Sequence, residues 1–105
     1  MSKAAKFDSD FYISENQDVA EAIFNGSLES PIKHFELFGA RESRAPNEFF
    51  SPSFYSEKNS DVAIAVDNAV FENSFHHYKT FGEQENRAPS PDFEGFNQSS
   101  YLFEN

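Results

Sequence analysis

The sequence predicts an all-α fold made of two tandem repeats of three short helices, followed by a C-terminal capping helix. The first observation is a repeated phrase, because ESRAP at residues 42–46 returns 43 residues later as ENRAP at residues 85–89. The second is the presence of 14 Phe and 4 Tyr, since a disordered acidic chain lacks the aromatic residues whose burial offsets the entropy cost of folding. The third is the spacing of apolar residues at steps of three and four, which is typical of helices.

The repeat extends over nearly the whole chain without a gap. When the sequence is shifted by 43 residues, about 17 of 40 aligned positions are identical, which indicates an internal duplication. We therefore expect a single domain, 1–105, with repeat 1 at 7–49, repeat 2 at 50–92 and a partial third repeat at 93–105. Because the last unit of an array needs a cover for its apolar face, the partial copy is interpreted as a capping helix.

The first helix of each repeat is predicted from its N-cap. Asp8 in repeat 1 and Ser51 in repeat 2 are residue types whose side chains accept hydrogen bonds from the first backbone N–H groups of a helix. Pro52 suits the first helical position in repeat 2. We expect a helix of about two turns in each copy.

The second helix of each repeat is expected to begin at an asparagine. Asn16 and Asn59 are interpreted as its N-caps. Asp18 and Asp61 then lie in its first turn, where the helix dipole favours acidic side chains.

The third helix carries the clearest apolar stripe and is expected to form the main core face. Its apolar residues recur at steps of four, three and three, which are Leu28, Ile32, Phe35 and Phe38 in repeat 1 and Phe71, Phe75, Tyr78 and Phe81 in repeat 2. Gly39 and Gly82 follow these stripes directly, so we expect each of them to end the helix in the left-handed conformation.

The Arg-Ala-Pro phrase is expected to form the corner that leads out of each unit, because proline biases the residue before it away from helix. Arg44 and Arg87 are expected to anchor the corner, either by pairing with Asp18 and Asp61 or by capping helix carbonyls. Either role is structural. The residues that define the repeat, all assigned structural roles, are Asn16, Asp18, His34, Gly39, Arg44, Pro46, Asn59, Asp61, His77, Gly82, Arg87 and Pro89.

Composition excludes several classes of partner. With 18 acidic and 8 basic residues, the net charge of -10 repels nucleic acid phosphates, so we expect no nucleic acid partner. The absence of cysteine excludes disulfides and thiolate metal sites. No stretch approaches about 18 apolar residues, and the N-terminal segment lacks the apolar region of a signal peptide, so neither membrane insertion nor a cleavable signal is expected.

No catalytic residue, metal site or cofactor is predicted. His34 and His77 recur at one position of the repeat and His76 adjoins the second, but a metal site needs further ligands that converge, so packing or capping is favoured. Asp8 and Asp10 form a DxD pattern without the glycine and the distant glutamate of a calcium loop, which favours helix capping. A metal-assisted hydrolase is the third and least favoured hypothesis.

Three stretches of the first copy resemble a known family. Residues 7–22 read Phe-Asp-x-x-Phe-Tyr-Ile-x-x-Asn-x-Asp-Val-Ala-x-Ala, and His-Phe-x-x-Phe-Gly and Glu-x-Arg-x-Pro follow at 34–39 and 42–46. This pattern resembles a short helical repeat of bacterial proteins, notably from cyanobacteria and alphaproteobacteria, which is common in large secreted or surface proteins with RTX-type calcium-binding repeats. The chain departs from the usual spelling at Gln17 and Ser60, where the family has proline, and at Ser43 and Asn86, where it has glycine.

The leading functional hypothesis is a non-enzymatic structural or interaction module whose partner is a protein, either a second copy or a larger assembly. The resemblance implies a cell-surface or secreted setting and carries over no site residues. A small virion protein of a phage head or tail is the alternative. Phe24 and Phe103 are the candidate interface residues, whereas packing between the repeats is favoured for Phe49 and Tyr101.

Overall fold

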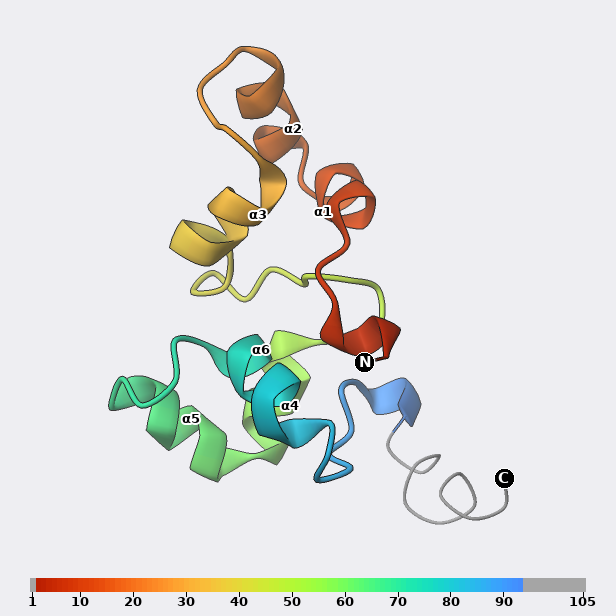
Figure 1. The fold of residues 1–105 in the computed structure, drawn as a ribbon, viewed down its shortest axis with the longest axis vertical. Coiled ribbons are helices and arrows are strands. Elements are labelled where there is room, and N and C mark those ends of the chain that lie inside the picture. The colour runs from red at the N-terminus through yellow and green to blue at the C-terminus, as the bar shows by residue number, and fades with distance from the viewer. Residues whose placement is uncertain (1, 94–105) are drawn as a thin grey trace.

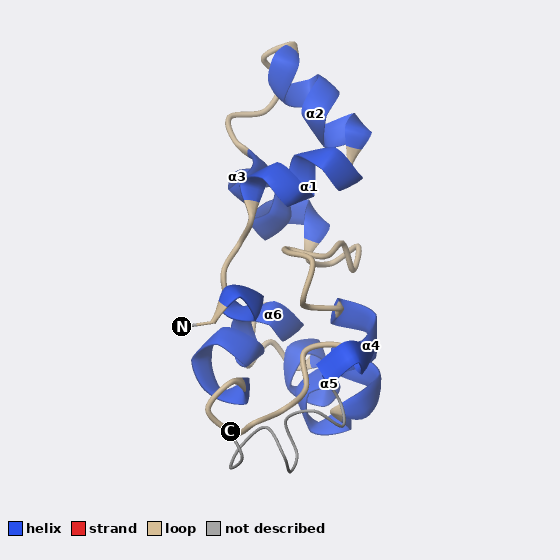
Figure 2. Ribbon diagram, turned by 90° about the vertical axis from the view of Figure 1, so that its right-hand side faces the viewer, coloured by secondary structure: helices blue, strands red, loops and turns tan. Residues whose placement is uncertain are grey.

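The computed structural model describes residues 2–93, and the regular secondary structure in this part of the chain is helical. It contains six α-helices and no strand, which confirms the predicted all-α class. Figure 1 shows the helices in two groups, one above the other, and Figure 2 shows the same groups from the side. We refer to residues 2–49 as the first half and residues 50–93 as the second half. Predictions about residues 94–105, including Tyr101, Phe103 and the capping helix, lie outside the described residues.

The helices follow the chain in the same order in both halves. The first half contains α1 (Ser9–Glu15), α2 (Gln17–Phe24) and α3 (Pro31–His34), and α3 continues as a π-helical turn, Phe35–Gly39. The second half contains α4 (Pro52–Lys58), α5 (Ser60–Asp67) and α6 (Ser74–His77), followed by a π-helical turn, Tyr78–Gly82. Short 3-10 turns lie at Lys3–Ala5 and Pro91–Phe93. None of the described helices is long and apolar enough to cross a bilayer.

The predicted caps of the first helices are confirmed. The Asp8 carboxylate accepts a hydrogen bond from the backbone N–H of Phe11 at 3.1 Å, and the Ser51 hydroxyl accepts one from Phe54 at 3.3 Å. Pro52 occupies the first turn of α4 as expected. These side chains satisfy N–H groups that have no partner inside the helix.

The structure confirms Asn16 and Asn59 as the N-cap residues of the second helices, but their side chains do not make the capping bond that this position favours. Both residues stand at the N-cap position of α2 and α5, yet neither side chain accepts a bond from the helix that follows. Instead, each side-chain amide donates backwards, Asn16 to the Tyr12 carbonyl at 2.7 Å and Asn59 to the Tyr55 carbonyl at 2.8 Å. Each asparagine therefore ties the end of one helix to the start of the next.

The π-helical turns end at Gly39 and Gly82, but neither glycine is left-handed, so the expected left-handed stop was wrong. The left-handed residues lie four positions later, at Ser43 (φ 59°) and Asn86 (φ 60°). The backbone N–H of Arg44 donates to the Gly39 carbonyl at 3.0 Å and that of Ser43 to the Ala40 carbonyl at 3.2 Å, which is the bond pattern of a Schellman motif. Glycine is the usual residue at that position, because a side chain there strains the backbone.

Gly39 and Gly82 have a different role, which is to make room for a tyrosine. A Cβ atom on Gly39 would lie well inside contact distance of the Tyr12 hydroxyl, and one on Gly82 would collide in the same way with Tyr55. Neither glycine has a positive φ. The chain thus needs glycine here for close approach of a side chain and not for a special backbone angle.

The core is formed by aromatic rings from both halves. Tyr12 and Tyr55 are fully buried, and the fully buried side chains also include Phe50, Val19 and Val62. Phe35 of the first half meets Phe75 of the second edge to face, with ring centroids 5.8 Å apart. One apolar cluster therefore extends across the two halves.

The last residues of the predicted stripes are not part of this core, which corrects the sequence analysis. Phe38 is 50% exposed and Phe81 is 46% exposed. The physical reason is the π-helical turn, which places more residues in one turn than an α-helix and so rotates these side chains away from the buried face. Ile32 of the same stripe is also exposed, whereas its counterpart Phe75 is buried.

The Arg-Ala-Pro corners at 44–46 and 87–89 connect the end of each half to its first helix. The Pro46 carbonyl accepts a hydrogen bond from the Asp8 backbone at 2.9 Å, and the Pro89 carbonyl accepts one from Ser51 at 2.8 Å. Asn47, next along the chain and only 2% exposed, donates from its side chain to the carbonyls of Ala4 and Lys6 at 3.0 and 2.7 Å. This buried amide fixes the N-terminal segment against the corner.

Candidate functional site

Each half contains a buried pair formed by a tyrosine and a histidine. The Tyr12 hydroxyl on α1 lies 2.8 Å from Nδ1 of His34 at the end of α3, and the Tyr55 hydroxyl lies 2.9 Å from Nδ1 of His77. Both tyrosine side chains are fully buried, so a partner for the hydroxyl is required. The pair connects the first helix of each half with the third.

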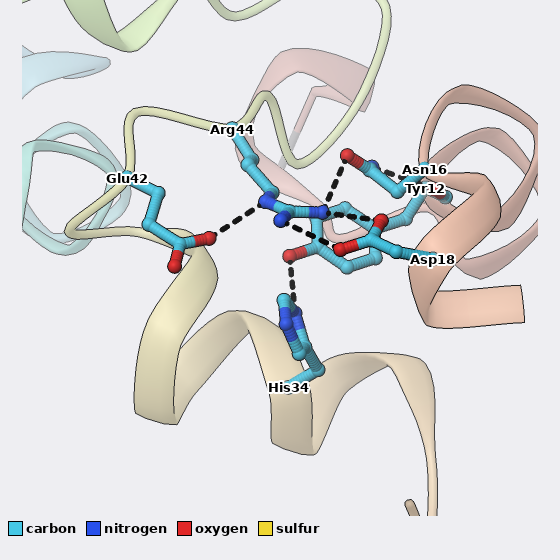
Figure 3. A network of polar contacts seen from close by, with 6 residues as sticks. All are labelled: Tyr12, Asn16, Asp18, His34, Glu42 and Arg44. Atoms are coloured by element: carbon cyan, nitrogen blue, oxygen red, sulfur yellow. Dashed lines mark hydrogen bonds and ion pairs between the residues drawn. The ribbon is translucent and has the colours of Figure 1, made fainter. Parts of the chain in front are cut away.

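An arginine lies beside each of these pairs and connects three parts of the half (Figure 3). The Arg44 guanidinium donates two parallel bonds to the Asp18 carboxylate, both 2.9 Å long. It also donates to the side-chain oxygen of Asn16 at 2.9 Å and, through Nε, to Glu42 at 2.8 Å. Of the two roles expected for this arginine, the structure shows the pairing with aspartate.

The second half has the same arrangement at positions 43 residues later. Arg87 donates two bonds to Asp61 at 3.0 and 2.9 Å, one to Asn59 at 2.8 Å and one to Glu85 at 2.7 Å. We call the set Tyr12, Asn16, Asp18, His34, Glu42 and Arg44 the first polar cluster, and the set Tyr55, Asn59, Asp61, His77, Glu85 and Arg87 the second polar cluster.

Burial and charge shift the proton affinities of several members of these clusters. Burial raises the pKa of Tyr12 to about 12 and also raises the pKa of Tyr55, so both phenols stay protonated at neutral pH. The hydrogen bond from Arg44 lowers the pKa of Asp18 to about 2, and the bond from Arg87 lowers the pKa of Asp61. Burial, with a further contribution from the positive charge of Arg87, lowers the pKa of His77 and favours its neutral form.

The half-exposed phenylalanines lie against the histidines of the clusters. The Phe38 ring centroid is 5.6 Å from that of His34, and the Phe81 ring centroid is 6.0 Å from that of His77. In the second half, Phe71 meets the His77 ring edge to face at 4.9 Å. These rings separate the histidines from solvent, and both histidines are buried.

The clusters do not form a metal centre in the described part of the chain. Within residues 2–93, no group of three or more His, Asp or Glu side chains is placed to hold a metal ion. The two arginines use their guanidinium groups on carboxylates and amides of their own half. The chemical consequence of the arrangement is cohesion, because it links the three helices of each half and the corner that follows them.

Sequence reasoning selected most of the cluster residues but missed others. The residues it had singled out, Asn16, Asp18, His34 and Arg44, lie together in the first polar cluster, as do Asn59, Asp61, His77 and Arg87 in the second. It did not assign partners to Tyr12, Tyr55, Glu42 or Glu85. Tyr12 is equivalent to Tyr55, and Glu42 is equivalent to Glu85. This identity between the two copies is the signal that could have found them.

The candidate interface residue Phe24 lies away from the clusters. It is the last residue of α2, and its side chain is 93% exposed. Phe103 lies outside the described residues. Phe49 is partly buried and packs against the core.

Comparison with known proteins assigns no family, since no family model, curated protein or solved structure matches the chain.

Proposed function

We propose that the chain is a tandem helical-repeat module with a non-enzymatic, structural or interaction role. The observation that carries the proposal is the use of the recurring polar residues inside the molecule. Each polar cluster joins the helices of its own half through a buried Tyr–His pair and an arginine fork. Residues that recur in both copies thereby serve the fold of a repeating unit, as expected when a chain is selected for its shape.

The partner that we propose is a protein. The net charge of -10 disfavours nucleic acid and anionic membranes, and an exposed phenylalanine at the tip of the first half is a residue type that anchors protein interfaces. The proposed setting is a cell-surface or secreted assembly, which the resemblance of the sequence to bacterial surface-protein repeats supports.

The test is the recovery of the full chain from its source cells after mild cross-linking. The culture medium, the cell envelope and purified particles are separated, and the mass and composition of each cross-linked species are measured. The proposal expects a fixed ratio between the chain and an envelope or secreted protein. A fixed ratio with virion proteins would replace the surface setting by a virion. Recovery of the chain as a monomer, cross-linked neither to another protein nor to a second copy, would refute the proposed assembly.

A further inference from the structure

The turn that follows α2 carries a three-residue motif that the polar clusters do not use. Asn25, Gly26 and Ser27 read Asn-x-Ser, with a residue other than proline in the middle. In secreted proteins this motif is the acceptor for sugars that are attached to the asparagine side chain. A second Asn-x-Ser motif, at residues 97–99, lies outside the described residues.

The turn is open to solvent. Asn25, Gly26 and Ser27 are all exposed. Phe24, the residue before them, is 93% exposed, so its ring is not packed over the turn. A Cβ atom added to Gly26 would meet no atom within 4 Å, which shows that the space beside the turn is empty. An enzyme can therefore reach the Asn25 side chain while the chain stays folded.

The Asn25 side chain is held by its oxygen and not by its nitrogen. Oδ1 of Asn25 accepts two hydrogen bonds from Ser27, one from the hydroxyl at 2.7 Å and one from the backbone N–H at 3.0 Å. Because a backbone N–H can only donate, this bond identifies which side-chain atom is the oxygen. Within residues 2–93, the Nδ2 group of Asn25 donates no hydrogen bond. The nitrogen to which a sugar would be attached is thus available.

Other asparagines of the fold use this nitrogen. Asn16 and Asn59 each donate from Nδ2 to a backbone carbonyl, at 2.7 and 2.8 Å. Asn47 donates to two carbonyls and is only 2% exposed. The side chains of these three residues hold the fold together, whereas the Nδ2 group of Asn25 has no such role.

The two bonds to Oδ1 prepare the amide for attack on a sugar. An amide nitrogen is a weak nucleophile, because its lone pair is delocalised onto the oxygen. When Nδ2 attacks and loses a proton, negative charge develops on Oδ1, and donors aimed at that atom stabilise the charge as in an oxyanion hole. The Ser27 hydroxyl supplies a donor that an apolar residue at this position would lack.

The second half contains the same turn without the hydroxyl. Its residues are Asn68, Ala69 and Val70, which are also exposed. The Ser27 backbone N–H donates to the Ala22 carbonyl at 2.8 Å, and the Val70 N–H donates to the Ala65 carbonyl at 2.8 Å. The two turns therefore share this backbone bond, and Asn68 is an internal control for an exposed asparagine without a hydroxyl two positions later.

We propose that Asn25 is the acceptor of an N-linked sugar. The co-substrate is an activated sugar whose anomeric carbon carries a diphosphate leaving group, and a glycosyltransferase of the source cells catalyses the transfer. A bond forms between Nδ2 and the anomeric carbon. The bond from that carbon to the diphosphate oxygen breaks, its electron pair leaves with the diphosphate, and one Nδ2 proton passes to a base of the transferase. The inference goes beyond the proposed function and does not depend on the identity of the protein partner.

The experiment maps the modification on the full chain purified from its source cells. Cleavage after lysine gives peptides 7–33 and 59–79, which contain Asn25 and Asn68, and fragment mass spectra locate any added mass. Ser27→Val copies the turn of the second half, Ser27→Thr is the matched control that keeps a hydroxyl, and Val70→Ser gives Asn68 the complete motif. We expect a sugar on Asn25 in the parent and in Ser27→Thr, loss of that sugar in Ser27→Val, and a sugar on Asn68 in Val70→Ser alone.

Three results would overturn the inference. They are a parent chain whose Asn25 carries no sugar, a Ser27→Val variant that is modified like its parent, and a sugar attached to the Ser27 oxygen instead of to Asn25. A Val70→Ser variant without a sugar on Asn68 would refute the role assigned to the hydroxyl. Circular dichroism melts of the variants establish that the substitutions leave the fold intact. An unmodified chain that is still cross-linked in a fixed ratio to another protein would refute the sugar site alone and leave the proposed function standing.

Discussion

Replacing Gly39 by alanine tests how closely the buried tyrosine packs against the third helix. The new Cβ atom would meet the Tyr12 hydroxyl well inside contact distance, so Tyr12 must move and its hydrogen bond to His34 must lengthen or break. Overpacking of a core costs about 1–3 kcal/mol, and a helical alanine gains back up to about 1 kcal/mol over glycine. We expect a net loss of about 1–2 kcal/mol in the free energy of unfolding.

The physical cause is isolated by removing the hydroxyl itself. Tyr12→Phe alone leaves His34 without its partner and is expected to cost about 1–2 kcal/mol. In the double variant the nearest remaining ring atom, Cζ of residue 12, lies 3.1 Å from the new Cβ, a tight contact that small shifts relieve. The double variant is therefore expected to be about 1–2 kcal/mol more stable than the sum of the single losses predicts.

The assay is urea unfolding, monitored by circular dichroism, of the parent chain, the two single variants and the double variant. A matched control combines Gly39→Ala with Tyr55→Phe, whose tyrosine belongs to the other half, and its losses should add to within about 0.5 kcal/mol. The reasoning would be refuted if Gly39→Ala left the stability unchanged or if Tyr12→Phe gave no more relief than Tyr55→Phe.

Three further predictions concern the backbone, a buried amide and pH. Ala69 has a positive φ of 64° at the position where the first half has Gly26. In urea unfolding, Ala69→Gly should therefore stabilise the chain by up to about 1 kcal/mol, and Gly26→Ala should destabilise it by about as much. Changes of the same sign in the free energy of unfolding of the two variants would contradict this. Asn47→Ala should cost about 2–3 kcal/mol in the same measurement, because buried carbonyls of the N-terminal segment lose their donor, and a loss below about 0.5 kcal/mol would show that Asn47 does not fix that segment. The pKa of His77 is lowered from 6.5, so its contribution to stability is complete above pH 6.5 and declines as the pH falls below that value. The pKa of Asp18 is lowered from 3.8 to about 2, so its contribution is lost as the pH falls between those two values. Melting temperatures measured from pH 8 to pH 2 that do not fall in both windows would contradict these assignments.

Helix positions and their first caps could be predicted from the sequence because they depend on local patterns. Asp8 and Ser51 cap the helices that they precede, since a side chain of this type reaches only the N–H groups next to it. The apolar spacing also located the third helix of each half. It could not reveal the π-helical turns, because a pattern read at a period of 3.6 residues assumes α-helical geometry throughout.

The roles of the glycines could not be assigned from the sequence because two physical reasons favour the same residue. A glycine after an apolar stripe is compatible with a left-handed stop and with close approach of another side chain. At Gly39 the second reason applies, and the partner, Tyr12, lies far away in the sequence.

The contacts of the polar clusters could be predicted only in part, because the residues that meet lie far apart in the sequence. Pairing with Asp18 was one of the two roles expected for Arg44, and in the structure a guanidinium nitrogen of Arg44 lies 2.9 Å from a carboxylate oxygen of Asp18. The buried Tyr–His pair depends on how α1 crosses α3, which no local pattern specifies. The duplication held a signal that the sequence analysis did not use, since a tyrosine and a histidine recur with the same separation in both halves.

The most direct test of this account is a nuclear Overhauser measurement between assigned aromatic side chains in solution. Two halves with the same internal structure should give contacts from Tyr12 to His34 and from Tyr55 to His77, together with one contact from Phe35 to Phe75 that joins the halves. Finding only one of the two Tyr–His contacts, or no contact between Phe35 and Phe75, would contradict the account.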